Sequence, residues 1–114
     1  MSAKLTSRQG GDVTVIDAAG RITLGDGASS FRDTIRDLAA KGNKKLLLNL
    51  ADVSYIDSSG IGEMVSGFTT VTNNGGQLKL LGLSKRVKDL LQITKLYTVF
   101  EVFDDETTAI RSFH

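Results

Sequence analysis

Residues Lys45 to Gly62 have the sequence KLLLNLADVSYIDSSGIG, which is the most informative part of the chain for predicting the fold. It opens with the almost continuous apolar run Lys45–Leu50. Such a run, bounded by turn residues, is typical of a strand covered on both faces of a parallel sheet. It closes with Asp57-Ser58-Ser59-Gly60, which favours a helix start because short polar side chains cap unpaired backbone N–H groups. We therefore expect a central strand followed by a helix.

The same alternation of strand and helix patterns continues on both sides of this stretch. Further strands are expected at 4–8, 13–18, 77–81 and 99–103. Helices are expected from Asp26 or Ser29 to about residue 41, from residue 57 to the stop at 74–76, from Ser84, and from Asp104 or Asp105. Gly20 is expected to end the second strand and Gly42 to follow the first helix.

This order of elements predicts an α/β fold. Strands that alternate with helices favour a mainly parallel central sheet with right-handed crossovers. The Gly10-Gly11 turn between the first two strands adds an antiparallel N-terminal edge strand. About four helices are expected around the sheet. With 114 residues and no linker, the chain is predicted to be a single domain, 1–114.

Composition excludes several classes of protein. Hydrophobic residues make up 40% and charged residues 24%, which is typical of a globular protein rather than a disordered one. No apolar run approaches the ~18 residues of a membrane span, and no signal peptide opens the chain, so a cytoplasmic location is expected. The net charge of +1, with no Trp, gives no case for nucleic-acid binding.

The chain lacks the residues that the common catalytic and metal-binding sites require. The chain has no Cys and a single His at position 114, which leaves no zinc ligand set and no Ser-His-acid triad. Gly20 and Gly25 have the spacing of a phosphate-binding loop, but Asp26 stands where Lys is required. A phosphorylated-aspartate switch at Asp57 lacks the acidic pair that would hold magnesium. We expect neither enzyme activity nor a metal or cofactor.

The stretch from Tyr55 to Gly62 has a functional and a structural interpretation, and the residues alone do not decide between them. Hydroxyl groups at a helix N-terminus are well placed for phosphate, and glycines allow another backbone to approach. The same residues are also ordinary capping chemistry and close packing. Small-ligand or nucleotide binding at this helix start is a weaker third interpretation.

Lys85, Arg86 and Lys88 form a small basic cluster early in the third helix. A solvated helix face is the more common explanation of such a run. The functional explanation is a contact with an acidic partner or with phosphate.

The run from Leu48 to Gly62, with Asp57-Ser58-Ser59-Gly60 at its centre, resembles the bacterial anti-anti-sigma factors, which are single STAS domains. The resemblance implies a STAS-like α/β sandwich. It also implies a partner, an anti-sigma factor that is a serine kinase: the unphosphorylated form binds this kinase and frees the sigma factor. Ser58 is the implied phosphorylation site, and a serine phosphatase restores it. The implied partner-binding residues are Asp57, Ser58, Ser59, Gly60, Ile61, Gly62, Arg21, Thr23 and Asp26.

One departure from the family pattern concerns the partner surface. Family members often carry an acidic residue shortly after the Gly20 turn, whereas this chain has Arg21, Ile22 and Thr23 there. The alternative function is a STAS assembly module of a stress-signalling scaffold or of a cytoplasmic lipid-transport complex. The sequence does not predict the oligomeric state.

Overall fold

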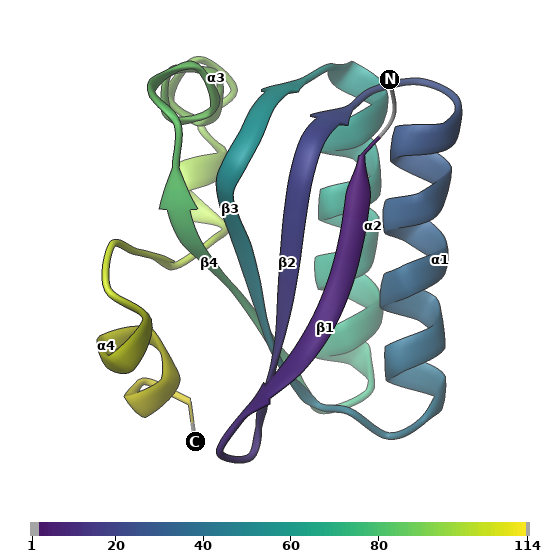
Figure 1. Cartoon of the computed structure of the whole chain (residues 1–114), viewed down its shortest axis with the longest axis vertical. Helices are drawn as coiled ribbons and strands as arrows, with labels where there is room; N and C mark the ends of the chain where they lie inside the picture. Colours follow the sequence, from purple (N-terminus) through teal and green to yellow (C-terminus); the bar gives the residue numbers. More distant parts are fainter. Residues whose placement is uncertain (1–2, 114) are drawn as a thin grey trace.

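A five-stranded sheet forms the centre of the computed structural model, which describes residues 3–113 (Figure 1). The strands lie in chain order across the sheet: β1 (Lys4–Gly10), β2 (Val13–Ile22), β3 (Lys45–Ile56), β4 (Gln77–Leu83) and β5 (Val102–Phe103). β1 is antiparallel to β2, and the other neighbouring strands are parallel. This confirms the predicted sheet. His114 lies outside the described residues.

Four α-helices and one short 3-10 helix accompany the sheet in the described part of the chain. They are α1 (Asp26–Ala40), α2 (Ser58–Asn73), α3 (Lys85–Ile93), η1 (Leu96–Thr98) and α4 (Glu106–Arg111). α1 and α2 lie side by side on one face of the sheet, and α4 lies near the opposite end of the strands from α3 (Figure 1). The predicted α/β class with about four helices is confirmed.

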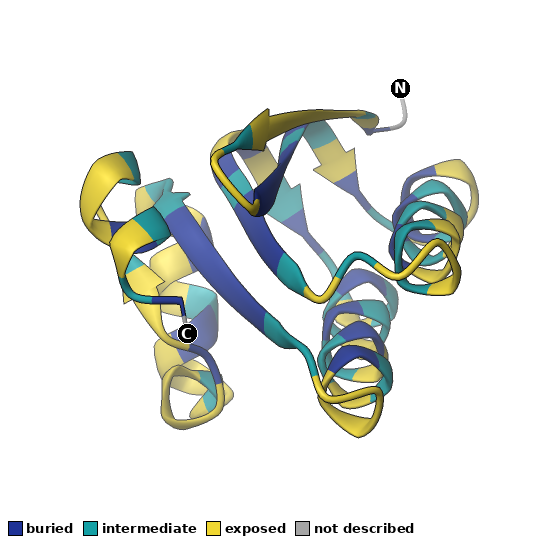
Figure 2. Ribbon diagram, turned by 90° about the horizontal axis from the view of Figure 1, so that it is seen from below, coloured by how far each residue is buried: buried dark blue, intermediate teal, exposed yellow. Residues whose placement is uncertain are grey.

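Two buried clusters hold the layers together. The larger one joins the inner face of the sheet to α1 and α2 and includes Ile16, Leu48, Phe31 and Met64. The smaller one lies on the other face, beneath α4, and is built from Val13, Val15, Leu47, Leu81, Ala109 and Phe113. The strands between these clusters are buried over most of their length (Figure 2). Because β3 is covered on both faces near its start, its sequence there is continuously apolar.

The second strand does not end at Gly20, as the sequence suggested. Gly20 has φ 97°, and the pairing register with β3 shifts between Gly20 and Arg21. The glycine therefore makes an irregularity inside the strand, after which pairing resumes as far as Ile22. The carbonyl of Gly20 accepts a hydrogen bond from the Ser54 hydroxyl at 3.2 Å. This irregularity determines where Arg21 and Ile22 emerge at the end of the sheet.

β3 is twice as long as the predicted run, 12 residues instead of 45–50. Its second half pairs with the end of β2, with Ala19 opposite Asp52 and Ile22 opposite Ile56. The apolar signal fades there because residues 51 and 52 are exposed and the helices no longer cover both faces. The extension carries β3 directly to the start of α2.

Helix boundaries follow the predicted capping residues with one exception. Asp57, Ser84 and Asp105 cap α2, α3 and α4 through their side chains. α1 differs: Gly25 precedes it, and no side chain caps it, so neither Asp26 nor Ser29 has the capping role. The last strand is also shorter than the predicted 99–103: β5 covers only Val102–Phe103, and Val99 still has helical backbone angles because it follows η1 (Leu96–Thr98) as its C-cap.

Arg8 ties the edge strand β1 to β2 and to the distant helix α4. Its guanidinium donates to Asp17 at 2.7 Å and, through two nitrogens, to Glu106 at 2.6 and 2.9 Å. Asn49 donates to the same Asp17 carboxylate at 2.9 Å. The hydrogen bonds from Arg8 are the main reason why the pKa values of Asp17 and Glu106 lie below their usual range.

The Arg8→Gln variant is expected to lose roughly 1 kcal/mol of stability at neutral pH, since the groups are partly exposed and solvent screens them. Because both carboxyl pKa values are depressed in the folded state, their contribution is present above about pH 4 and is lost as the pH falls through the folded values. Urea unfolding of both proteins at pH 7 and at pH 3 measures this. The difference between them should shrink at pH 3, and an equal difference at both pH values would contradict the assignment.

Candidate functional site

The carboxyl ends of β2 and β3 bring the two predicted site segments together. One segment is the turn from β2 into α1, and the other is the passage from β3 into α2 (Figure 1). The backbone N–H of Asp57 donates to the carbonyl of Ile22 at 3.3 Å, which joins them directly. Crevices outside the carboxyl ends of parallel strands are where open α/β sheets usually bind ligands and partners.

Asp57 is the residue that organises this end of the molecule. One carboxylate oxygen accepts a hydrogen bond from the Gly60 N–H at 2.9 Å, which caps α2. The other accepts from the Leu24 N–H at 2.9 Å, across to the turn after β2. The bond from Gly60 and then that from Leu24 hold the pKa of Asp57 below its usual range. The carboxylate therefore fixes both the helix start and the neighbouring loop.

The Asp57→Ala variant is expected to melt at a lower temperature and to free the Leu24 loop, because both bonds are lost. Asp57→Asn is the matched control: its one carbonyl oxygen can keep the Gly60 bond, so most of the loss should fall on Leu24. Amide hydrogen exchange at Leu24 and Gly60 separates the two effects. Unchanged protection of both amides in Asp57→Ala would contradict this role.

Ser58 is the first residue of α2 and is exposed to solvent. Within residues 3–113 its hydroxyl has no hydrogen-bond partner, as is also true of Ser59, whereas the Ser84 hydroxyl caps α3. Since Asp57 supplies the cap, the Ser58 hydroxyl is not needed to terminate the helix. Ser59 is half-buried beside it. Because Asp57 already occupies a first-turn N–H, the start of α2 is not an empty anion site.

The two glycines of the motif have different surroundings. A Cβ atom on Gly60 would lie against the carbonyl oxygen of Ile22 and 2.7 Å from Cγ2 of Ile56. Gly60 is buried, so the absence of a side chain there serves packing within the chain. A Cβ atom on Gly62 would have nothing within 4 Å, and this residue is exposed. Ile61 between them is half-buried.

The residues predicted after β2 lie at the same end of the molecule. Arg21 and Asp26 are exposed, and Thr23 is half-buried. Leu24, which the sequence did not single out, is 80% exposed. An apolar side chain so exposed next to a polar motif is a feature of contact surfaces. Its only signal in the sequence is its position in a short turn, where burial is not expected.

Tyr55 opens the stretch that the sequence singled out, but the sequence assigned it no role at the site. The guanidinium of Arg21 lies 5.5 Å from the centre of its ring, and that of Arg86 lies 5.7 Å from it. A hollow of about 510 Å³ opens beside this group and is lined by Tyr55, Lys85, Arg86, Asp89, Leu90 and Ile93. α3 thus contributes to the same end of the molecule as the motif.

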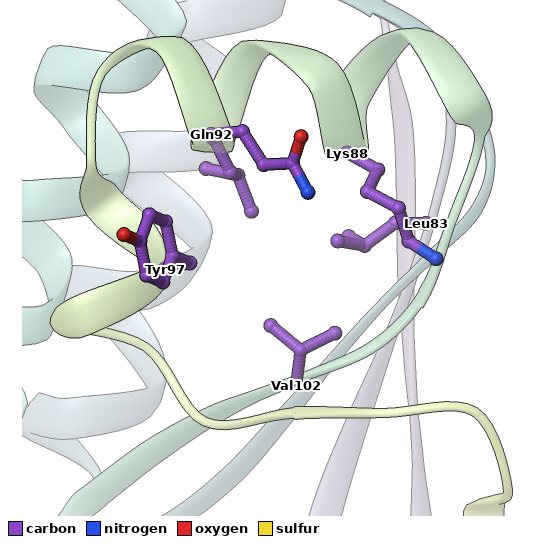
Figure 3. A pocket seen from close by; sticks show the side chains of 6 residues that line it. Leu83, Lys88, Gln92, Tyr97 and Val102 are labelled. Carbon is purple, nitrogen blue, oxygen red and sulfur yellow. The ribbon is translucent and has the colours of Figure 1, made fainter.

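The predicted basic cluster of α3 is divided between two sides of the helix. Lys88 lines a different hollow of about 520 Å³, together with Leu83, Leu91, Gln92, Tyr97 and Val102 (Figure 3). Lys85 and Arg86 face the hollow beside Tyr55 instead.

Among residues 3–113 no helix is long and apolar enough to cross a membrane, and no three His, Cys, Asp or Glu residues gather in a way that suits a metal ion.

Comparison with known proteins places this geometry in a family. The model of the STAS domain matches residues 4–109. The anti-sigma-B factor antagonist of Bacillus subtilis is 34% identical over 102 residues, which cover 90% of this chain and 92% of that protein. The anti-sigma-B factor antagonist of Staphylococcus aureus is 31% identical over 72 residues, covering 63% of this chain and 67% of that protein.

Solved structures agree on the fold. The crystal structure of an anti-sigma factor antagonist from Mycobacterium paratuberculosis has a TM-score of 0.87 at 15% identity and covers 98% of this chain and 94% of that chain. The Bacillus cell fate determinant SpoIIAA in its phosphorylated form has a TM-score of 0.74 at 20% identity, with 95% and 97% covered. The chain therefore belongs to the STAS domain family and, within it, to the group of bacterial anti-sigma factor antagonists.

Proposed function

We propose that the protein is an anti-sigma factor antagonist whose binding is controlled by phosphorylation of Ser58. In its unphosphorylated form it binds an anti-sigma factor that is also a serine kinase, and the sigma factor is released. Phosphorylation weakens this binding, and a serine phosphatase reverses it. The chain itself acts by binding in the cytoplasm and catalyses nothing; any ATP belongs to the kinase.

The observation that supports the proposal most strongly is that Asp57 caps α2, whereas the side chain of its neighbour Ser58 takes no part in holding the fold. Asp57 caps α2 and holds the neighbouring loop through two hydrogen bonds at 2.9 Å. Ser58 is exposed beside it, and its hydroxyl has no partner within residues 3–113. Modification of Ser58 therefore removes no hydrogen bond of its side chain. The fold should survive phosphorylation, as a reversible switch requires.

Electrostatics explains why phosphate at this position weakens binding. A phosphoserine adds ~1.5–2 negative charges, and here they appear next to the Asp57 carboxylate. The depressed pKa of Asp57 means that this carboxylate is ionised at neutral pH. Burying the phosphate under a partner requires removal of its water, and the adjacent carboxylate offers no compensation. A partner that covers Ser58 is thus repelled by the modification.

The docking surface proposed for the partner consists of Asp57, Ser58, Ser59, Ile61, Gly62, Arg21, Thr23 and Asp26, with Leu24 added. Exposed Ser58 and Gly62 face solvent directly, and Gly62 leaves open space into which a partner side chain can fit. Gly60 lies beneath them and contributes by letting α2 approach β2.

A capture experiment tests this function. Immobilised protein and its Ser58→Asp variant are incubated with lysate of the source bacterium, and bound proteins are identified by mass spectrometry. We expect the unmodified protein, and not the variant, to retain a protein that also binds a sigma factor. Equal retention of a transporter component or a stress-signalling scaffold by both would contradict the proposal and favour an assembly module.

A further inference from the structure

Three positively charged side chains gather around Tyr55 at the same end of the molecule as Ser58. Arg21 comes from the end of β2, and Lys85 and Arg86 come from the first turn of α3. The guanidiniums of Arg21 and Arg86 lie 5.5 and 5.7 Å from the centre of the Tyr55 ring. We call Arg21, Lys85 and Arg86 the Tyr55 cation cluster.

The charges of this cluster are not neutralised within the described chain. Among residues 3–113, Arg8, Arg32, Lys41, Lys45 and Lys79 form ion pairs, whereas no member of the cluster does. Asp89 lines the hollow beside the cluster without pairing with it. The nearby Asp57 carboxylate is committed to two backbone N–H groups.

The position of Lys85 and Arg86 at the start of α3 makes their unpaired positive charges still less favourable. The N-terminal end of a helix carries the positive end of the helix dipole, so cations in the first turn are unfavourable there. α3 has no acidic residue in its first turn. An arrangement that opposes local stability in this way is expected where a site serves function.

The hollow beside the cluster has an apolar floor. Leu90 and Ile93 line it together with Tyr55, and Ile93 is 79% exposed. Phosphate or a single carboxylate would use only the cations and leave this apolar surface in water. A nucleobase would need a free aromatic face, but guanidiniums already stack on Tyr55. Cations at the rim and an aliphatic floor match an acidic polypeptide segment with an apolar side.

We propose that the Tyr55 cation cluster and the adjoining hollow dock an acidic, amphipathic segment of the protein partner. Carboxylates of that segment face Arg21, Lys85 and Arg86, and an apolar side chain covers Leu90 and Ile93. The inference rests on the proposed function for the identity of the partner, because it assumes that the partner over Ser58 also reaches α3. It assigns the chemistry of that partner: its contact surface is acidic.

An acidic partner surface would also increase the loss of binding affinity that phosphorylation of Ser58 causes. Tyr55 precedes Ser58 by three residues, so a phosphate on Ser58 introduces negative charge at the edge of the same surface. That charge offsets the attraction of the cation cluster and repels the carboxylates of the partner. The effect of phosphorylation is therefore larger with an acidic partner than with a neutral one.

A titration with a defined probe tests the inference without the partner. The ¹⁵N-labelled full chain is mixed with a synthetic helical peptide that presents Glu on one side and Leu on the other, and with the same peptide carrying Lys in place of Glu. We expect the Glu peptide to shift the amide signals of Arg21, Tyr55, Arg86, Leu90 and Ile93. Arg21→Glu and Arg86→Glu should each weaken its binding roughly tenfold, with a strong dependence on salt.

Arg36→Glu is the matched control, because it makes the same charge change on an exposed position of α1. It should leave the affinity for the Glu peptide unchanged. Arg86→Glu should also raise the melting temperature, since it places an acid at the start of α3. Equal binding of the Lys peptide, unaltered affinity of both cluster variants, or stronger shifts at these residues with an oligonucleotide or anionic phosphatidylglycerol vesicles would overturn the inference.

The rate of Ser58 phosphorylation in lysate separates this inference from the proposed function. One outcome is that the wild-type protein and the Arg36→Glu control are phosphorylated at the same rate and the two cluster variants much more slowly. That result supports both the phosphorylation switch and the acidic partner surface. If the cluster variants are phosphorylated at the wild-type rate, the acidic partner is excluded and the phosphorylation switch remains. If Ser58 is never phosphorylated but the Glu peptide binds as described, the switch fails and the docking surface remains.

Discussion

Replacement of Gly60 by alanine is expected to destabilise the protein by about 3 kcal/mol or more, the upper end of the cost of overpacking. The new Cβ atom would lie against the carbonyl oxygen of Ile22, which is backbone and cannot rotate away. It would also lie 2.7 Å from Cγ2 of Ile56. α2 would have to move off the end of β2 and take the Asp57 and Ser58 site with it. Chemical denaturation measures the loss.

Gly62→Ala is the matched control for this variant. Gly62 lies in the same helix, and its added Cβ would have nothing within 4 Å. Alanine is favoured over glycine inside a helix by roughly 0.5–1 kcal/mol, so Gly62→Ala should be neutral or stabilising. If both variants were equally stable, the close approach of α2 to β2 would be wrong as described.

Phosphorylation of Ser58 is expected to weaken partner binding by about 100-fold, or roughly 2.7 kcal/mol, with little change in the stability of the fold. The Ser58→Asp variant should show a smaller loss in the same direction, because it adds only one charge. Ser58→Ala should bind like the wild type and resist modification. Isothermal titration with the captured kinase gives the affinities, and thermal unfolding gives the stability.

Ser66→Asp is the control for added charge on α2, since Ser66 is exposed further along the same helix. It should bind the partner as the wild type does. Undiminished binding by Ser58→Asp and by the phosphorylated protein would show that the partner does not cover Ser58. A large loss of fold stability on phosphorylation would contradict the independence of the cap from the Ser58 hydroxyl.

The sequence was sufficient for the order of elements and for the location of the motif. Continuous apolar runs predicted the buried parts of β3 and β4, and capping chemistry predicted the starts of α2 and α3. It failed where tertiary contacts decide the outcome. The second half of β3 is a strand because it pairs with the end of β2, and Gly20 lies inside β2 because its positive φ is absorbed by an irregularity.

At the candidate site, too, the sequence pattern did not predict contacts between residues far apart in the chain. Local pattern predicted that Asp57 opens a helix, but its second bond to Leu24 spans 33 positions in the sequence. The two motif glycines look alike in sequence, and only the packing of Ile22 against α2 distinguishes Gly60 from Gly62. Likewise, Arg21 and Arg86 lie far apart in the chain, so their meeting over Tyr55 has no local signal.

Mapping phosphate on the full chain is the most direct test of the proposed switch at Ser58. Purified protein is incubated with ATP and native lysate of the source bacterium from several growth conditions, and its peptides are analysed by mass spectrometry. We predict phosphate on Ser58, absent from the Ser58→Ala variant. Protein that stays unmodified at Ser58 and Ser59 under every condition would contradict the phosphorylation switch, and would leave Asp57-Ser58-Ser59 as a helix start in a domain that binds by shape alone.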